Sequence, residues 1–397
     1  MTEDRIGRRQ FVERASGAAM MLTASMTSGA AGAANQPESD PLQSVYAGPL
    51  GDFDARDRQF DSLEFSLASY DHVKPSLGFS AADQRAAQLW QGRARNKLTE
   101  LLGGFPSTRV PLKAQVIGKK EFANYTQEKI VFDSRDRLSV FGYLLLPRGR
   151  ASAIPAVICL PGHGRGCDDI VGIGPDGVQR NSKSGYAKDF ALQVVENGYA
   201  AFAIEQLAFG CRRDPASRKR SPEQSSCQPA AGAALLLGQT MIGWRVWDVM
   251  RAIDFLGTRA EIDSSRIATM GISGGGTVSL FAAALDERIK NAVVSGYFNT
   301  FRDSIVSISH CIDNYVPGIL NYFEMYDLAG LIAPRGLFVE SGTRDPIFPI
   351  QGSRYAYKKA QEIYATFGSQ NRLGQEIFEG EHVFNGKGAF EYLKRWL

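Results

Sequence analysis

Three residues in the second half of the chain have the types and the spacing that acyl transfer requires: Ser273, Asp345 and His382. Ser273 stands in the only Gly-x-Ser-x-Gly pattern of the sequence, with an apolar run before it and a predicted helix after it. A strand-to-helix turn here would hold the serine in a strained backbone conformation with its hydroxyl exposed, and small flanking residues would relieve the crowding. The pattern therefore predicts that Ser273 is a nucleophile.

A serine hydroxyl becomes an effective nucleophile when a base takes its proton. His382 follows the last predicted strand, and Asp345 follows the strand before it. We expect His382 to be the base and Asp345 to orient its imidazole, since the chain order serine, acid, histidine recurs among serine hydrolases. Glu340 is the alternative acid, although it lies within a predicted strand rather than after it.

The charge that develops on the carbonyl oxygen during acyl transfer requires backbone N–H donors. Gly274, directly after the nucleophile, can supply one of them. The second is expected from the glycine-rich loop at residues 160–166, where Gly164 or Arg165 is the candidate donor. We interpret His163, in the same loop, as shaping the loop or contacting substrate rather than transferring protons.

Two long connections, residues 206–233 and 298–333, would lie above the predicted sheet and shape the access of a substrate. Glu205 and Arg212 would either line the substrate pocket or form a structural ion pair. The full set of candidate substrate contacts is His163, Glu205, Arg212, His310 and Tyr315.

From about residue 110 onward, predicted strands alternate with predicted helices. Continuous apolar runs such as 154–160 are typical of strands that are buried on both faces of a parallel sheet. A helix that begins near residue 80, with Ser80 as its N-cap, precedes this part. We predict the α/β class, with a mostly parallel doubly wound sheet, helices on both faces and an N-terminal helical arm. The predicted strands are 125–133, 138–147, 154–160, 199–204, 266–271, 289–295, 336–341 and 376–379, and the later helices are 184–197, 235–257, 274–285, 351–367 and 388–396.

The first residues have the features of an export signal rather than of a folded element. The pair Arg8–Arg9 precedes the apolar Phe11–Val12, as in twin-arginine signals, and a weakly apolar run with a small-residue cleavage site follows. No cysteine stands near that site to carry a lipid anchor. We therefore expect a periplasmic or secreted protein. Its expected parts are a signal at 1–34, an extension with the helical arm at 35–110 and a catalytic domain at 111–397.

The charge and apolar patterns exclude some classes of partner. The 45 basic and 42 acidic residues leave a net charge of +3, which does not indicate a nucleic-acid binder. Beyond the signal, no run is long and apolar enough to anchor the chain in a membrane. The expected partner is a small-molecule or carbohydrate ester.

The five cysteines are an odd number, so at least one thiol stays unpaired in an oxidising compartment. Cys211 and Cys227 are the best candidates for a disulfide, and Cys159 is expected to be a small core residue. No Cys/His spacing is typical of a zinc site, and the chain has only four histidines. We therefore expect no metal and no cofactor.

Several segments of the chain, among them the one around Ser273, resemble a bacterial group of α/β-hydrolases related to dienelactone hydrolases and acetylxylan esterases. The resemblance covers residues 80–397 and implies hydrolysis of a carboxylic ester through an acyl-enzyme, often on acetylated sugars and without a cofactor. Dienelactone hydrolases have a cysteine where this chain has Ser273, and acetylxylan and cephalosporin deacetylases have glutamine where it has Gly274. The segments that carry the resemblance are 161–164, 205–210, 237–248, 271–275, 310–318 and 342–349.

Three other functions are compatible with the same fold. A peptidase of the prolyl-oligopeptidase type usually has a large N-terminal propeller, which the roughly 75 residues between signal and sheet are too few to form. A catalytically silent binding protein typically lacks a member of the triad, whereas all three are present here. An acyltransferase differs only in whether water or an alcohol accepts the acyl group. The sequence leaves that choice, the two halves of the substrate and the oligomeric state open.

Overall fold

The computed structural model describes residues 58, 60–150, 152–180 and 182–397. The chain divides into two compact units, Met1–His72 and Val73–Leu397. The export signal predicted at residues 1–34 lies outside the described residues. In the first unit, helix α2 (Ser62–Asp71) begins after Asp61, whose side chain accepts hydrogen bonds from two backbone amides of the first turn. The predicted boundaries at 34 and 110 stay predictions.

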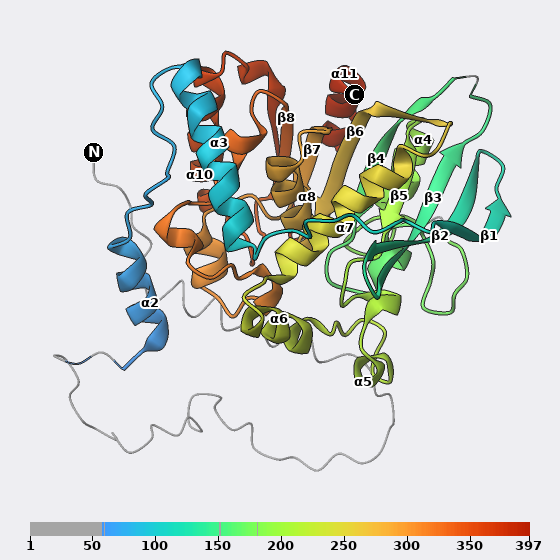
Figure 1. Ribbon diagram of the computed structural model, residues 1–397, viewed down its shortest axis with the longest axis horizontal. Helices are drawn as coiled ribbons and strands as arrows, with labels where there is room; N and C mark the ends of the chain where they lie inside the picture. The colour runs from blue at the N-terminus through green and yellow to red at the C-terminus, as the bar shows by residue number, and fades with distance from the viewer. Residues whose placement is uncertain (1–57, 59, 151, 181) are drawn as a thin grey trace, which may run out of the picture. The chain divides into compact units, whose positions relative to one another are not determined.

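The second unit is built on a nine-stranded sheet (Figure 1). Its strand order is β1-β2-β3-β5-β4-β6-β7-β8-β9, in which the first three strands pair antiparallel and the strands from β5 onward run parallel to one another. This confirms the predicted α/β fold. The strands are β1 (Gln115–Glu121), β2 (Tyr125–Arg135), β3 (Leu138–Pro147), β4 (Ile154–Leu160), β5 (Ala200–Ile204), β6 (Ile262–Ile272), β7 (Ile289–Ser295), β8 (Gly336–Gly342) and β9 (Leu373–Phe378).

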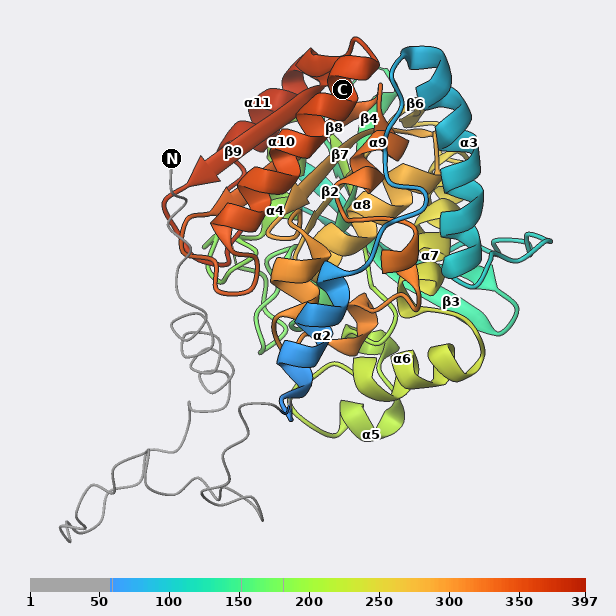
Figure 2. The same ribbon diagram turned by 90° about the vertical axis from the view of Figure 1, so that its left-hand side faces the viewer.

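Helices cover both faces of this sheet, and each face has its own apolar core (Figure 2). The alternation of side chains along a strand divides β4 between the two cores: Ile158 belongs to the larger core and Val157 to the smaller. The larger core is completed by α3 (Gln84–Leu101), α7 (Met241–Leu256), α8 (Gly274–Leu285), α9 (Asp327–Ile332) and α10 (Ile350–Thr366), and the smaller by α4 (Phe190–Glu196) and α11 (Lys387–Trp396).

The predicted helical arm is α3, and it packs within the second unit. Its N-cap is Asp83, whose side chain accepts from the Ala86 amide, so the expectation of Ser80 as the cap was wrong. Trp90 is 4% exposed, packs edge-on against Phe79 and donates its indole N–H to a backbone carbonyl. The arm is therefore part of the hydrophobic core.

Two further elements differ from the predictions. The helix expected over 235–257 is two helices, α6 (Cys227–Leu236) and α7, separated by a turn in which the Thr240 side chain caps α7. Strand β1 was not predicted, because its side chains are almost all exposed and leave no apolar alternation. In the described ranges, no helix combines the length and the apolar character that crossing a membrane requires.

Truncation of Trp90 tests whether α3 is part of the folding unit. We expect Trp90→Ala to lower the free energy of unfolding by about 3–5 kcal/mol, since it opens a cavity in the core. Leu89→Ala, on the exposed side of the same helix, is the matched control and should change stability by less than about 0.5 kcal/mol. Urea unfolding of both variants measures the difference, and equal midpoints would contradict a packed α3.

Candidate active site

Ser273 occupies a sharp turn between β6 and α8. Its backbone lies in the left-handed region, with φ 56° and ψ −125°, which is rare for a residue with a side chain. The turn packs tightly against the end of β4, because a Cβ atom on Gly275 would lie 1.9 Å from the Leu160 carbonyl oxygen. The Gly-x-Ser-x-Gly pattern thus corresponds to a strained strand-to-helix turn, as predicted for a nucleophile.

His382 and Asp345 are joined by a hydrogen bond of 2.7 Å between Nδ1 and Oδ2. The other carboxylate oxygen of Asp345 accepts from the amides of Ile347 and Phe348, which fixes the acid in the loop after β8. The Phe348 ring stacks on the imidazole at a centroid distance of 5.7 Å. Among the described residues, the buried Nε2 of His382 has no hydrogen-bond partner, so it is free to receive a proton.

The end of β7 brings the serine and the histidine to the same edge of the sheet. The Ser273 amide donates to the Ser295 carbonyl, at 3.0 Å. The next residue, Gly296, lies against the histidine, since a Cβ atom there would be 3.0 Å from Cε1 of His382. The structure therefore brings together the three residues that the sequence predicts as nucleophile, base and acid.

Glu340, the alternative acid, has a different role. Its carboxylate accepts from the Ser295 hydroxyl at 2.6 Å and from the amides of Asn385 and Gly386 at 2.9 Å. Burial raises the pKa of this carboxyl group above its ordinary value. Glu340 therefore anchors the chain that follows His382, and Asp345 is the acid that contacts the imidazole.

The loop after β4 contains Arg165, one of the predicted oxyanion donors, and its amide already has an acceptor. The Arg165 amide donates to Oδ2 of Asp169, at 2.7 Å, so that donor is already used and the prediction of Arg165 was wrong. Within the described chain, the amides of His163, Gly164 and Gly274 have no intramolecular acceptor. These three N–H groups are available to a ligand oxygen.

Tyr186 is a further residue of the candidate site, one that the sequence does not predict. Its hydroxyl donates to the His163 carbonyl, at 2.7 Å, and its ring stacks on His382 at a centroid distance of 6.1 Å. It therefore holds the glycine-rich loop and the histidine at the same time. No local motif marks it, because both contacts join segments that are distant in sequence.

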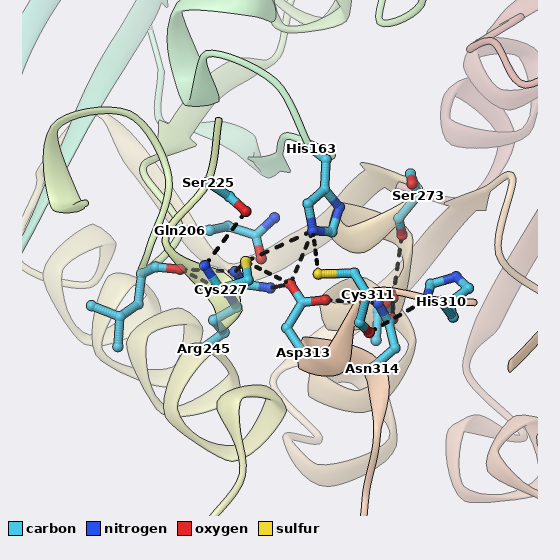
Figure 3. Close-up of polar contacts among 12 residues, drawn as sticks. His163, Gln206, Ser225, Cys227, Arg245, Ser273, His310, Cys311, Asp313 and Asn314 are labelled. Carbon is cyan, nitrogen blue, oxygen red and sulfur yellow. Dashed lines mark hydrogen bonds and ion pairs between the residues drawn. The ribbon is translucent and has the colours of Figure 1, made fainter. Parts of the chain in front are cut away.

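The His163 side chain points into a polar cluster with Cys227, Cys311 and Asp313 (Figure 3). The predicted disulfide between Cys211 and Cys227 was wrong: both are free thiols, Cys211 is exposed, and Cys227 is buried beside His163. Cys159 is fully buried, as predicted for a core residue.

Glu205 and Arg212 do not form the ion pair that was one of their alternatives. Arg212 pairs with Asp248 at 2.7 Å, and it donates to the backbone carbonyl of Glu205 rather than to its carboxylate. The Glu205 carboxylate is 2% exposed and accepts from the amide and the thiol of Cys167. Burial raises its pKa to about 7. Both side chains support the loops around the site.

His310 is near His382, the candidate base, because both imidazoles contact the same aromatic ring. The Phe348 ring that stacks on His382 also contacts His310, edge to face, at a centroid distance of 5.7 Å. Burial lowers the pKa of His310 to about 4, so its imidazole is neutral at pH 7. Tyr315 is 39% exposed and donates its hydroxyl to the Ile305 carbonyl. Their contact with a substrate stays a prediction.

Known proteins share this fold. The sequence matches the Abhydrolase family over residues 55–372. It is 26% identical over 317 residues to "Putative hydrolase YtaP" of Bacillus subtilis, an alignment that covers 76% of this chain and 98% of that protein. A solved structure of a "putative acetyl xylan esterase" from Bacteroides fragilis superposes with a TM-score of 0.68 at 20% identity, covering 81% of this chain and 83% of that one. A glucuronoyl esterase from Solibacter usitatus superposes with a TM-score of 0.58 at 18% identity, covering 81% and 96%.

The raised pKa of Glu205 predicts a pH-dependent stability. The folded protein keeps this carboxyl protonated up to about pH 7, whereas the unfolded chain loses the proton near 4.5, so stability present below pH 4.5 is lost as pH rises to 7. We expect the free energy of unfolding of wild type to fall by up to about 3 kcal/mol relative to Glu205→Gln over this interval. Urea unfolding of wild type and Glu205→Gln at several pH values measures this difference in the free energy of unfolding.

Glu223→Gln is the control, since Glu223 is an exposed residue of the connection that follows Glu205. The difference between wild type and this control should not change with pH. A Glu205→Gln difference that is equally flat would contradict a protonated Glu205 in the folded protein.

Proposed function

Because the chain belongs to the Abhydrolase family, with residues 55–372 matching it, we propose that it is a serine hydrolase of carboxylic esters. Ser273 is the nucleophile, His382 the base and Asp345 the acid. The observation that carries the proposal is the 2.7 Å bond between His382 Nδ1 and Asp345 Oδ2, with Nε2 unpartnered among the described residues, beside the strained turn of Ser273.

In the proposed reaction, the Ser273 hydroxyl attacks the ester carbonyl carbon while Nε2 of His382 takes the hydroxyl proton. Asp345 accepts the Nδ1–H bond, which fixes the imidazole tautomer and stabilises the imidazolium. The imidazolium then gives its proton to the leaving alcohol, and an acyl-enzyme remains. Water repeats the sequence, so the acid is released and the serine is restored.

The negative oxygen of the tetrahedral intermediate needs donors that are in place before the reaction. The amide of Gly274 and the amides of His163 and Gly164 are the candidates, since the described chain provides no acceptor for them. They come from two sides of the turn: Gly274 begins α8, and the other two lie in the loop after β4. The Tyr186 hydroxyl fixes this loop through the His163 carbonyl.

For the substrate we propose an acyl ester of a carbohydrate. Structures with the same fold include proteins named as an acetyl xylan esterase and a glucuronoyl esterase, and the predicted export signal fits a substrate met outside the cytoplasm. A panel of p-nitrophenyl esters of increasing chain length, acetylated xylan and sugar methyl esters separates acetyl, longer acyl and uronate esters. A prolyl peptide substrate and an added acceptor alcohol in the panel separate a peptidase and an acyltransferase.

Replacement of the nucleophile is the direct test. We expect Ser273→Ala to reduce hydrolysis of p-nitrophenyl acetate by a factor on the order of 10⁶ while the thermal unfolding midpoint stays close to wild type. A fluorophosphonate probe should label Ser273, as located by peptide mass spectrometry. Unchanged hydrolysis, or labelling of another residue, would overturn the assignment.

A pair of carboxyl-to-amide variants distinguishes the two carboxylates near the site. Asp345→Asn should lower kcat by about 10⁴-fold, because the amide favours the wrong imidazole tautomer, by analogy with the serine-protease triad. Glu340→Gln is the matched control, because it alters the anchor of residues 385–386 without touching the imidazole. We expect it to lower stability and to reduce kcat far less. The reverse order of kcat values would make Glu340 the acid.

A further inference from the structure

Four ligand-type side chains converge at one point beside the candidate active site (Figure 3). They are His163, Cys227, Cys311 and Asp313, and their donor atoms all lie within 4.8 Å of one another. Cys227 and Asp313 are buried, at 1% exposure each, and the other two are partly buried. They come from three segments: the loop after β4, the first residue of α6, and the turn at η5 (Ile312–Asn314).

Nε2 of His163 lies at the centre of three close contacts with the other members of the cluster. Nε2 of His163 lies 3.1 Å from the Cys311 sulfur, 3.3 Å from Oδ2 of Asp313 and 3.7 Å from the Cys227 sulfur. A ring nitrogen either donates its one hydrogen or accepts through its one lone pair, so it does not form full hydrogen bonds with all three atoms at once. The same carboxylate oxygen lies 3.2 Å from the Cys227 sulfur. Such mutual spacing is what a shared central cation imposes on its ligands.

We propose that these four residues form a tetrahedral zinc site. Zinc takes Cys sulfur at about 2.3 Å and His nitrogen or carboxylate oxygen at about 2.0–2.2 Å, so ligand atoms at tetrahedral corners are about 3.3–3.8 Å apart. The distances of 3.3 and 3.7 Å lie in this interval, and those of 3.1 and 3.2 Å lie just below it. Sulfur and imidazole ligands favour zinc over magnesium or calcium.

Arg245 supports this assignment through charge. Its guanidinium donates to Oδ2 of Asp313 at 2.5 Å and to the Cys227 sulfur at 3.3 Å, and the side chain is 3% exposed. Two thiolates and one carboxylate would carry three negative charges, which Zn²⁺ and the guanidinium together neutralise. The Asn314 side chain donates to the other oxygen of Asp313, at 2.9 Å. Outer hydrogen bonds of this kind orient metal ligands.

Four protein ligands leave no open position, so the zinc is structural. It would link the glycine-rich loop at residues 160–166 to the two long connections at 206–233 and 298–333. The His163 ring also lies against the first residue of α8, since a Cβ atom on Gly274 would be 3.3 Å from its Nδ1. The proposal departs from the expectation that the chain holds no metal. The sequence spacing of these residues does not indicate a metal site, because Cys227 lies 64 residues after His163 and Cys311 lies a further 84 residues on.

The test is the zinc content of full-length protein without a histidine tag, purified after growth with zinc and dialysed against metal-free buffer. We expect about one zinc per chain by elemental analysis and by native mass spectrometry. Replacement with Co²⁺ should give the intense visible absorption of a tetrahedral thiolate site. Removal of the metal with 1,10-phenanthroline should lower the unfolding midpoint, and added Zn²⁺ should restore it.

Matched cysteine variants locate the site. Cys311→Ser should weaken zinc binding at least about tenfold, and Cys211→Ser, an exposed cysteine elsewhere in the same part of the chain, should bind as wild type does. A Cys311→Ser variant that does not fold leaves the Co²⁺ spectrum of wild type as the deciding measurement. A wild-type protein without zinc and without thiolate–Co²⁺ absorption would overturn the proposal. A Cys227–Cys311 disulfide, seen as a mass lower by two hydrogens, would also overturn it.

Discussion

The left-handed backbone of Ser273 is the constraint on which the rest of the site depends. A non-glycine residue in such a conformation stores about 1–3 kcal/mol, which the surrounding structure must offset. Here β6, the strand before it, is paired on both sides by β4 and β7, and α8 after it is buried along nearly its whole length. The Ser273 amide is held by the Ser295 carbonyl of β7. The central position of β6 therefore offsets the strain of the turn. It also determines which strands end next to Ser273.

Two carboxylates five residues apart, Glu340 and Asp345, show how position along the chain, rather than residue type, assigns a role. Glu340 lies within β8, and its carboxylate accepts hydrogen bonds from two backbone amides of the segment after His382. Asp345 lies beyond the strand, where two amides hold one oxygen and leave the other for the imidazole. An acid buried within the strand anchors the histidine loop, and an acid beyond the strand orients the ring.

The sequence predicted those parts of the molecule that local patterns determine. Apolar runs located β4 and β7 residue for residue, and the glycines around Ser273 located the turn. The exposed β1 was missed because edge strands need no apolar alternation. The Arg165 error arose because the Asp169 side chain, four residues later in the same loop, accepts the hydrogen of the Arg165 amide. The cysteine pairing was wrong because it depends on contacts between segments that are distant in sequence. Nearness in sequence suggested Cys211, whereas the fold places Cys227 beside Cys311.

The loop after β4 connects the proposed active site with the cluster of His163, Cys227, Cys311 and Asp313. On one side the Tyr186 hydroxyl holds the His163 carbonyl, and on the other the His163 ring enters the four-residue cluster. Backbone donors stabilise a developing oxyanion most when they do not reorganise during the reaction. A loop in which both the backbone and the side chain of His163 are held in place meets that requirement. In the proposed mechanism, the cluster therefore acts through the position of the His163 and Gly164 amides, and not through contact with the reacting atoms.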